Sequence, residues 1–396
     1  MKIAFFNDTY HPYVSGVITS MERFADSLKE YGHDVLLVVP GLLADSKRAR
    51  EGGVFELLSI PVPGFDGMRI GTPIMTDGHL SISGTVDANV DLVHAHSPFI
   101  VGKMGARLAE KRDLPLVFTC HSIYPNYSDY VPLVSELAED VIREYVIDFC
   151  SRCDLILAPS EYARSVLWDW GVSQEVEVLP SGIEAEDLER ARREVAASEG
   201  EVRRRLARDA MVPPRSRILL FVGRLDHRKN IDFLFEVLGI IHKEERIHLV
   251  IVGEGPAHTN LEDEARRRRI LDRVRFTGKL PFDRVARWYA AADVFCFPST
   301  SETQGLVLVE AMAAGLPVVA LKSPTSREIV DPGVNGLLSD EDPEEFASKV
   351  SSILRDPELA SRLRRGGLER AKGFSNEALT RELIGHYERL IERIGV

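Results

Sequence analysis

Residues 301–315 read SETQGLVLVEAMAAG and follow a short apolar run, Val294–Pro298. The apolar run predicts a buried strand, and Leu306–Ala314 has the composition of a helix that Gly315 ends. Because Gly305 allows a tight turn between the two, the first backbone N–H groups of the helix would point away from the strand's carboxyl end. A helix start of this kind attracts anions, so the stretch predicts a phosphate site.

Two glutamates accompany this turn. Glu310 lies inside the predicted helix, where its carboxylate could accept hydrogen bonds from a sugar diol. Glu302 lies in the loop, beside the predicted phosphate site. A carboxylate disfavours a phosphate there, so we expect Glu302 to face a neutral hydroxyl-rich group or developing positive charge. The simpler alternative is an ordinary amphipathic helix with one exposed and one capping glutamate.

Strand-like and helix-like stretches alternate along most of the chain, which predicts parallel sheets with helices on both faces. The expected strands are Ile3–Phe6, Val35–Val39, Leu92–His94, Leu116–Thr119, Leu155–Ala158, Val176–Leu179, Ile218–Val222, His248–Val252, Val274–Phe276, Val294–Phe297 and Pro317–Ala320. The expected helices of the first half are Val17–Tyr31, Ile100–Lys111, Leu133–Cys150 and Glu161–Trp170. Residues 41–90 carry many Gly and Pro residues and predict only a further strand or two.

The alternation divides into two domains. We expect an N-terminal domain over residues 1–180, joined by a last helix over 375–396, and a C-terminal domain over 181–374. The polar stretch Ser181–Pro214 reads as the linker region between them. Open α/β sheets bind ligands at the carboxyl ends of their strands, so the cleft between two such domains is the expected active site.

Composition excludes several classes of protein. The 396 residues are 44% hydrophobic and 28% charged, and no apolar run is long enough for a membrane span. The start, MKIAFFNDTY, reads as the first strand of a cytoplasmic domain and not as a signal peptide. Most of the net charge of −12 lies in the first half, which argues against nucleic acid as a partner.

The four cysteines predict no disulfide framework. Cys150 and Cys153 form a single CxxC pair, with no second pair at the spacing of a zinc site; the other two are Cys120 and Cys296. We expect two buried thiols at a helix end, with a redox or metal role as the alternative.

Glycine and histidine residues follow strands of the first half. Gly16 opens the helix at Val17 and permits close approach of an anion, although it could serve only as a helix cap. The sequence around it is not GxGxxG, which disfavours a nicotinamide-dependent dehydrogenase. His96 and His121 each follow a buried strand, so both are expected at the same edge of the sheet.

The seven-residue spacing of Glu302 and Glu310 inside this loop and helix resembles the signature of the retaining glycosyltransferases of family 4. The segments SETQGLVLVEAMAAG, HAHSPF and HSIYPNYSDYV are similar to the branch that glycosylates diacylglycerol. The resemblance covers essentially the whole chain. It implies the GT-B architecture, in which two facing Rossmann-like, doubly wound α/β domains hold the active site in the cleft between them.

The resemblance also implies roles for individual residues. Arg224 and Lys229 would grip the donor pyrophosphate, whose negative charge grows as the glycosidic bond breaks. Glu302 would orient the sugar, Glu310 would bind the ribose diol, and His121 would contact the transferred sugar at its 6-hydroxyl. Further donor-side residues are Gly16, Val17, Gly253, Leu280, Gln304, Gly305, Leu306 and Val307. Acceptor-side residues are His11, His96, Ser97, Tyr124, Tyr127 and Tyr130.

The implied reaction is retaining transfer of a hexose from a nucleotide sugar to a lipid hydroxyl. UDP-glucose is the expected donor, and GDP-mannose and UDP-galactose are the alternative donors. Diacylglycerol is the favoured acceptor, and phosphatidylinositol and a soluble sugar phosphate are the alternative acceptors. Asp340–Asp342 reads as a surface loop and no strand ends in DxD, so no obligatory metal is expected. An epimerase, a phosphorylase or a non-catalytic nucleotide-sugar-binding protein would be the alternatives of another class.

Two clusters of basic residues raise the question whether a membrane surface is a further partner. Lys103, Arg107 and Lys111 share one helix face, which suits either peripheral docking at the inner face of the plasma membrane or a solvated surface. The run Arg266–Arg269 favours a solvated helix end over a lipid-headgroup contact.

Overall fold

The computed structural model describes residues 1–13, 15–41, 53–62, 67–72, 90–123, 136–241 and 246–395. The chain divides into two compact units, one formed by Met1–Gly182 with Asn376–Val396 and the other by Ile183–Ser375. Each unit has its own sheet and its own apolar core on both faces of that sheet. In the described parts of the chain, every helix is too short or too polar to span a bilayer.

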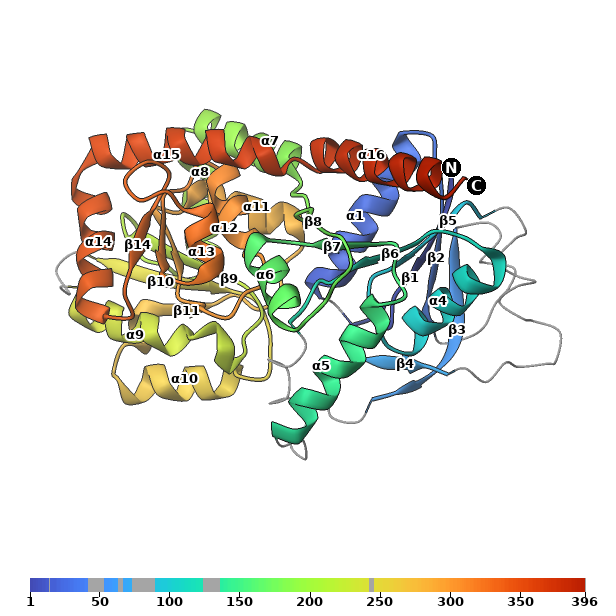
Figure 1. The fold of residues 1–396 in the computed structure, drawn as a ribbon. Coiled ribbons are helices and arrows are strands. Elements are labelled where there is room, and N and C mark those ends of the chain that lie inside the picture. The colour runs from blue at the N-terminus through green and yellow to red at the C-terminus, as the bar shows by residue number, and fades with distance from the viewer. Residues whose placement is uncertain are drawn as a thin grey trace. The chain divides into compact units, whose positions relative to one another are not determined.

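The sheet of the first unit has eight strands in the order β4-β3-β2-β1-β5-β6-β7-β8 (Figure 1). Neighbouring strands are parallel except for the β3–β4 pair. The strands are β1 (Lys2–Phe6), β2 (Asp34–Gly41), β3 (Val54–Pro61), β4 (Arg69–Gly71), β5 (Leu92–Ala95), β6 (Leu116–Thr119), β7 (Leu155–Ala158) and β8 (Val176–Val178). The six predicted strands are confirmed, and β3 and β4 lie in the stretch that predicted only a further strand or two.

Five helices described by the structure cover this sheet. They are α1 (Gly16–Glu30), α4 (Ile100–Arg112), α5 (Glu136–Cys150), α6 (Glu161–Asp169) and α16 (Asn376–Ile394). The last of them, α16, packs against α1, and its Leu383 and Tyr387 are fully buried in the core that α1 shares with the strands. The predicted start of α5 at Leu133 lies outside the described residues.

The second unit has a six-stranded, all-parallel sheet in the order β11-β10-β9-β12-β13-β14 (Figure 1). Its strands are β9 (Arg217–Val222), β10 (Ile247–Val252), β11 (Val274–Phe276), β12 (Val294–Phe297), β13 (Val318–Leu321) and β14 (Leu337–Ser339). The predicted strands are confirmed, but β14 was not foreseen. Its residues Leu-Leu-Ser show neither the apolar alternation of the equally short β8 and β11 nor a longer apolar run.

The helices of the second unit begin where the sequence suggested a linker. They are α7 (Ala185–Ala197), α8 (Glu201–Asp209), α9 (Ile231–Ile240), α10 (His258–Arg267), α11 (Phe282–Ala291), α12 (Leu306–Ala313), α13 (Pro324–Ile329), α14 (Pro343–Arg355) and α15 (Pro357–Ala371), with short 3-10 turns η2 (His227–Lys229), η4 (Leu271–Arg273) and η5 (Lys372–Phe374). The linker interpretation of Ser181–Pro214 was wrong. Leu188 and Leu206 of α7 and α8 are buried in the core of this unit, because a few apolar residues at helical spacing suffice to anchor a very polar helix.

All four cysteines are buried free thiols. Cys150 ends α5 and Cys153 follows it, as expected for thiols at a helix end. Burial raises the pKa of the Cys120 thiol to about 12, so this group stays protonated at neutral pH. Burial also raises the pKa values of the Cys150 and Cys153 thiols, and both side chains belong to the core of the first unit, so the CxxC pair reads as packing.

Candidate functional site

The turn between β12 and α12 has the geometry that its glycine predicts. Gly305 adopts the left-handed conformation, with φ 71° and ψ 41°, at the N-cap position of α12. Gly315 repeats a left-handed conformation just beyond the end of the same helix, with φ 74°. The helix α12 therefore starts near the carboxyl end of β12. Its first residues, Leu306 and Val307, follow Gln304 and Gly305.

The loop before this turn is held on both sides. The buried Thr325 hydroxyl, in the first turn of α13, donates to the backbone oxygen of Glu302 at 2.5 Å. The hydroxyls of Ser299 and Ser301 donate to the backbone oxygen of Arg228 at 3.4 Å each. Because α13 and η2 both anchor the loop, the position of Glu302 is fixed by its surroundings.

Lys229 and Glu302, two of the predicted site residues, form an ion pair. Their side chains are 24% and 21% exposed, so the pair is partly shielded from water. Lys229 is positioned by η2, where the Asp226 carboxylate accepts a hydrogen bond from Arg228 N at 3.0 Å. The sequence did not single out Asp226, although an Asp at a turn start is a recognisable capping signal.

Glu310 is 8% exposed and faces a buried tyrosine. The Tyr289 hydroxyl, on α11, donates to Glu310 Oε2 at 3.1 Å. This contact orients the carboxylate, which can accept about four hydrogen bonds. Sequence reasoning missed Tyr289, because nothing in its local sequence distinguishes it from an ordinary core aromatic.

The glycines of the GEGP turn after β10 pack against the loop after β9. A Cβ atom on Gly253 would lie 1.9 Å from the backbone oxygen of Gly223, and Gly253 N donates to Gly278 O at 3.0 Å. Close backbone approach between neighbouring loops therefore requires glycine at 253 whether or not a ligand is bound. The exposed Arg224 follows Gly223, and the half-buried Leu280 lies two residues after Gly278.

In the first unit, Asp8 caps the start of α4 from a neighbouring strand end. Its carboxylate accepts hydrogen bonds from Ser97 Oγ at 2.6 Å and from Val101 N at 2.7 Å. Burial raises the pKa of Asp8 above its usual value, although these hydrogen bonds act in the opposite direction. Ser97, predicted on the acceptor side, is buried and engaged in this cap.

Three histidines of this unit, His94, His96 and His121, form a stack of rings. His96 is 1% exposed, and its ring stacks on that of His94 with centroids 4.2 Å apart and an interplanar angle of 27°. His96 Nδ1 is 2.9 Å from His121 Nε2. His94 is held at both nitrogens, by the Tyr387 hydroxyl at 2.6 Å and by the Thr119 hydroxyl at 2.7 Å. His121 is half-buried at the end of this series, whereas His96 lies behind it.

The start of α1 is capped by a serine. Ser15 is the N-cap residue and its hydroxyl accepts a hydrogen bond from Ile18 N at 3.4 Å, so the alternative that Gly16 is the cap is wrong. Gly16 is exposed, and a Cβ atom added to it would meet no described atom within 4 Å. The fold therefore gives no packing reason for glycine at this position. Val17 is half-buried beside it, and the exposed His11 contacts Glu22 at 2.8 Å.

Other predicted residues fall in different places. Tyr124, Tyr127 and Tyr130 lie outside the described residues. Asp340–Asp342 is exposed as expected: Asp340 pairs with Lys322 at 2.7 Å, and Asp342 caps α14. Within the described ranges, no group of three His, Cys, Asp or Glu side chains could hold a metal ion.

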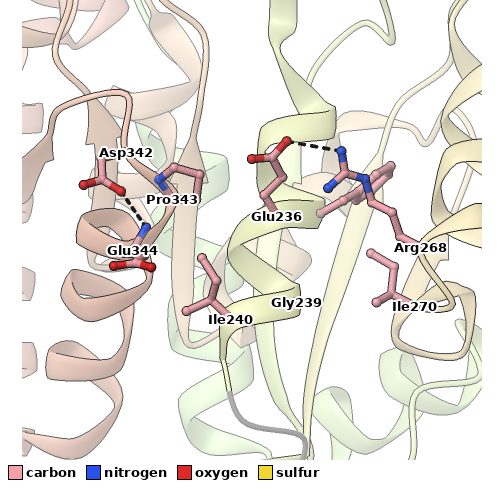
Figure 2. Close-up of a pocket in the computed structure, with 9 residues that line it drawn as sticks. Glu236, Gly239, Ile240, Arg268, Ile270, Asp342, Pro343 and Glu344 are labelled. Carbon is pink, nitrogen blue, oxygen red and sulfur yellow. Dashed lines mark hydrogen bonds and ion pairs between the residues drawn. The ribbon is translucent and has the colours of Figure 1, made fainter.

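An open groove of about 740 Å³ on the second unit is lined by α9, the end of α10 and the start of α14 (Figure 2). None of the predicted site residues lines it. Glu236 accepts from Arg268 at 3.2 Å, and Asp342 and Glu344 add further negative charge. Three carboxylates against one guanidinium disfavour a nucleoside diphosphate, so we do not assign the donor to this groove.

The basic clusters are also engaged within the protein. Arg266 pairs with Asp263 at 2.6 Å, and Arg268 pairs with Glu264 at 2.5 Å, as expected for a solvated helix end. In the other cluster, the Lys103 ammonium lies 3.6 Å from the centre of the Tyr145 ring of α5.

Comparison with known proteins places this geometry in a family. Residues 14–187 match the model described as Glycosyltransferase Family 4, and residues 202–370 match Glycosyl transferases group 1. An alpha-monoglucosyldiacylglycerol synthase of Streptococcus pneumoniae is 30% identical over 340 residues, which cover 85% of this chain and 75% of that protein. A GDP-mannose-dependent alpha-mannosyltransferase of Corynebacterium glutamicum is 27% identical over 396 residues, covering 99% of this chain and 89% of that protein.

A solved structure gives the same fold. The Anabaena protein HepE in complex with UDP superposes with a TM-score of 0.73 at 18% identity, over 98% of this chain and 100% of that one. Two parallel α/β sheets, the loop and helix that carry Glu302 and Glu310, and these relatives lead to one conclusion: the chain is a glycosyltransferase of family 4 with the GT-B fold.

Proposed function

We propose that this glycosyltransferase transfers glucose from UDP-glucose to a lipid hydroxyl such as that of diacylglycerol, with retention of the anomeric configuration. The observation that carries the proposal is the contact between Lys229 and Glu302 beside the start of α12, with Glu310 on the same helix. It brings a cation, an oriented carboxylate and a helix start to the carboxyl ends of β9 and β12. The name of the Streptococcus relative supports the lipid acceptor, and UDP in the Anabaena structure supports the nucleotide.

The donor's diphosphate is assigned to cationic groups of the second unit. When the bond between the sugar and the diphosphate breaks, negative charge accumulates on the departing phosphate oxygen. Lys229 and Arg224 stabilise that charge more in the transition state than in the ground state, which is the condition for acceleration. Backbone N–H groups at the start of α12 act in the same direction.

The ion pair gives Glu302 a role that changes when the donor binds. Without donor, the carboxylate and the ammonium neutralise each other. A diphosphate carries more charge than one carboxylate and shares Lys229, which leaves Glu302 to accept hydrogen bonds from sugar hydroxyls. As the sugar acquires oxocarbenium character, the same carboxylate stabilises its positive charge.

The nucleoside is assigned to Glu310. Its carboxylate is fixed by Tyr289 and lies within α12, whose start is assigned to the phosphates. A ribose diol offers two O–H donors to such a carboxylate. The other assigned donor residues are Gly16, Val17, Gly253, Leu280, Gln304, Gly305, Leu306 and Val307.

In the chemical step, one bond breaks, one bond forms and one proton is transferred. The bond from the sugar's anomeric carbon to the phosphate oxygen breaks, and its electron pair stays on the phosphate. The acceptor oxygen forms the new bond on the same face, and its proton passes to the departing phosphate. Retention often uses a carboxylate nucleophile. Here we assign Glu302 to orientation and charge, and His121 to the sugar's 6-hydroxyl.

The acceptor side is assigned to the first unit. His11 is exposed there and contacts Glu22, and the acceptor assignment of Tyr124, Tyr127 and Tyr130 rests on the sequence alone. A diacylglycerol acceptor lies in a membrane, so we also propose peripheral attachment to a membrane surface.

The test is a transfer assay with purified enzyme, UDP-glucose and diacylglycerol in mixed micelles. We expect release of UDP in equal amount to an α-linked glucosyl diacylglycerol. Lys229→Ala should lower the transfer rate roughly 100- to 1,000-fold, as for loss of one transition-state donor. Lys322→Ala is the matched control, because Lys322 pairs with surface Asp340. UDP release without glycolipid, a β-linked product, or equal activity of both variants would contradict the proposal.

A mannosyltransferase is the second candidate. The Corynebacterium relative is named for GDP-mannose and matches nearly the whole chain. Leu280, one of the donor-side residues that the resemblance implies, lies in the loop Gly278–Pro281, and recognition of the base by the backbone of this loop would not discriminate uracil from guanine. The same assay with GDP-mannose and phosphatidylinositol decides between the two candidates. Interconversion of UDP-sugars without transfer would indicate an epimerase instead.

A further inference from the structure

His96 and His121 share a single proton in the hydrogen bond between their rings. Their nitrogens Nδ1 and Nε2 lie 2.9 Å apart, which is a hydrogen bond, so one nitrogen carries the N–H and the other the lone pair. Two arrangements satisfy this distance. Either His96 donates from Nδ1, or His121 donates from Nε2.

The second nitrogen of His96 distinguishes the two arrangements. His96 Nε2 is buried and has no hydrogen-bond partner among the described residues. The His96 ring contacts two other rings, His94 at a centroid distance of 4.2 Å and Phe5 at 4.6 Å. If His121 donated, neutral His96 would carry its proton on Nε2 and bury an unpaired N–H. Such a group costs about 1–3 kcal/mol, and buried orphan N–H groups are rarer than unused acceptors.

We propose that His96 is a positioning residue that donates from Nδ1 to His121 Nε2 and thereby holds His121 in the tautomer protonated at Nδ1. Resting on the proposed function, this assigns His121 to the sugar as a hydrogen-bond donor and not as the base that takes the acceptor's proton. A neutral imidazole whose Nε2 already accepts a hydrogen bond has only an N–H to offer at Nδ1.

The surroundings keep both rings in the neutral state that the tautomer requires. Burial lowers the pKa of His121 to about 4 and lowers the pKa of His96 well below its usual value. The backbone of His96 is fixed by a hydrogen bond from its N–H to Phe6 O at 2.8 Å. Stacking on His94, which Tyr387 and Thr119 hold at both nitrogens, fixes the plane of the His96 ring.

The direct test is ¹⁵N NMR of the ring nitrogens of the full chain labelled with ¹⁵N-histidine, without ligand, at pH 7. Loss of one signal set in His121→Asn assigns His121. We expect Nδ1 of His121 to be protonated and Nε2 to be bare. A His121 protonated at Nε2, a doubly protonated ring, or averaging between tautomers would overturn the proposal. The spectrum needs no substrate, so failure of the transfer assay would reject the proposed function separately.

Two matched variants extend the test to function. His96→Asn keeps an N–H donor near the position of Nδ1, whereas His96→Asp offers only acceptor oxygens when ionised. We expect His121 to keep its tautomer in His96→Asn and to be protonated at Nε2 in His96→Asp. The transfer rate of the Asp variant should be about tenfold below that of the Asn variant, as for one hydrogen bond. The same tautomer in both variants would contradict the proposal. If the Asp variant does not fold, the wild-type spectrum still shows which nitrogen of His121 is protonated and so tests the proposal.

Discussion

At the scale of single residues, the candidate site of the second unit pairs one cation with one carboxylate. Lys229 and Glu302 are 73 positions apart in the sequence, yet they form a partly buried ion pair. When such an ion pair is exposed at a surface, it contributes little to the free energy of unfolding. Its interest lies in function, because each partner holds the other where a charged donor is expected to bind.

Glu302→Gln should separate binding from transfer. The amide keeps the size of the side chain but no longer competes for the Lys229 ammonium. We expect UDP to bind about fivefold more tightly, equivalent to about 1 kcal/mol, while the transfer rate falls because the sugar loses its carboxylate. Isothermal titration calorimetry with UDP and the transfer assay measure the two effects. Weaker UDP binding in Glu302→Gln would contradict the assignment of Lys229 to the diphosphate.

Tyr289→Phe should weaken donor binding with a smaller effect on chemistry. The variant removes only the hydroxyl that orients Glu310, at 3.1 Å, and keeps the buried ring. Loss of one hydrogen bond is worth about 1 kcal/mol, so we expect the KM for the nucleotide sugar to rise roughly fivefold. Tyr31→Phe is the control, because it removes a tyrosine hydroxyl of the other unit that donates to Glu377 at 3.5 Å, away from the predicted site residues. An unchanged KM in Tyr289→Phe would show that Glu310 does not depend on this contact.

At the scale of elements, two glycines predicted on the donor side serve different purposes. Gly253 is needed by the fold, because a Cβ atom would lie 1.9 Å from Gly223 O. Gly16 has open space around the position of a Cβ atom, so its lack of a side chain is unexplained by packing. Only the structure makes this distinction, since both residues follow strands in the sequence.

The two glycines give opposite predictions for substitution by alanine. Gly253→Ala should destabilise the protein by about 2–4 kcal/mol, because a backbone loop must move. Gly16→Ala should leave the melting temperature within about 1 °C and lower the transfer rate, if a donor approaches the backbone at the start of α1. Differential scanning calorimetry and the transfer assay measure both. A stable Gly253→Ala, or a fully active Gly16→Ala, would contradict one half of this distinction.

The elements also show what the sequence can predict. Apolar runs located β1, β6, β9 and β12, because buried parallel strands are continuous apolar segments. The polar helices α7 and α8 were mistaken for a linker, because composition outweighed the spacing of their few apolar residues. Likewise, the spacing of Glu302 and Glu310 predicted the turn and the helix, but their partners Lys229 and Tyr289 come from η2 and α11, two other parts of the chain. Contacts of that kind depend on tertiary packing and leave no local pattern.

At the scale of the whole molecule, buried neutral histidines link stability to pH. Burial lowers the pKa of His121 to about 4, and lowers the pKa values of His94 and His96 well below the usual value of 6.5. The unfolded chain therefore binds more protons than the folded chain below pH 6.5. Stability is fully present above pH 6.5 and is lost as the pH falls toward 4.

Thermal unfolding at a series of pH values tests this linkage. Between pH 7.5 and pH 4 we expect the free energy of unfolding to fall, with His121 alone contributing about 3 kcal/mol. His121→Asn should show a shallower fall over the same interval, because it has no proton to gain there. Equal slopes for wild type and variant would mean that His121 titrates normally in the folded protein.

The central claim is that Lys229, Arg224 and Glu310 of the second unit hold the donor's diphosphate and ribose. The most direct measurement is a crystal structure of the protein soaked with UDP. We predict phosphate oxygens within hydrogen-bond distance of Lys229 and Arg224, and the ribose hydroxyls on the Glu310 carboxylate. UDP bound elsewhere, for instance in the groove lined by Glu236 and Arg268, would contradict the account.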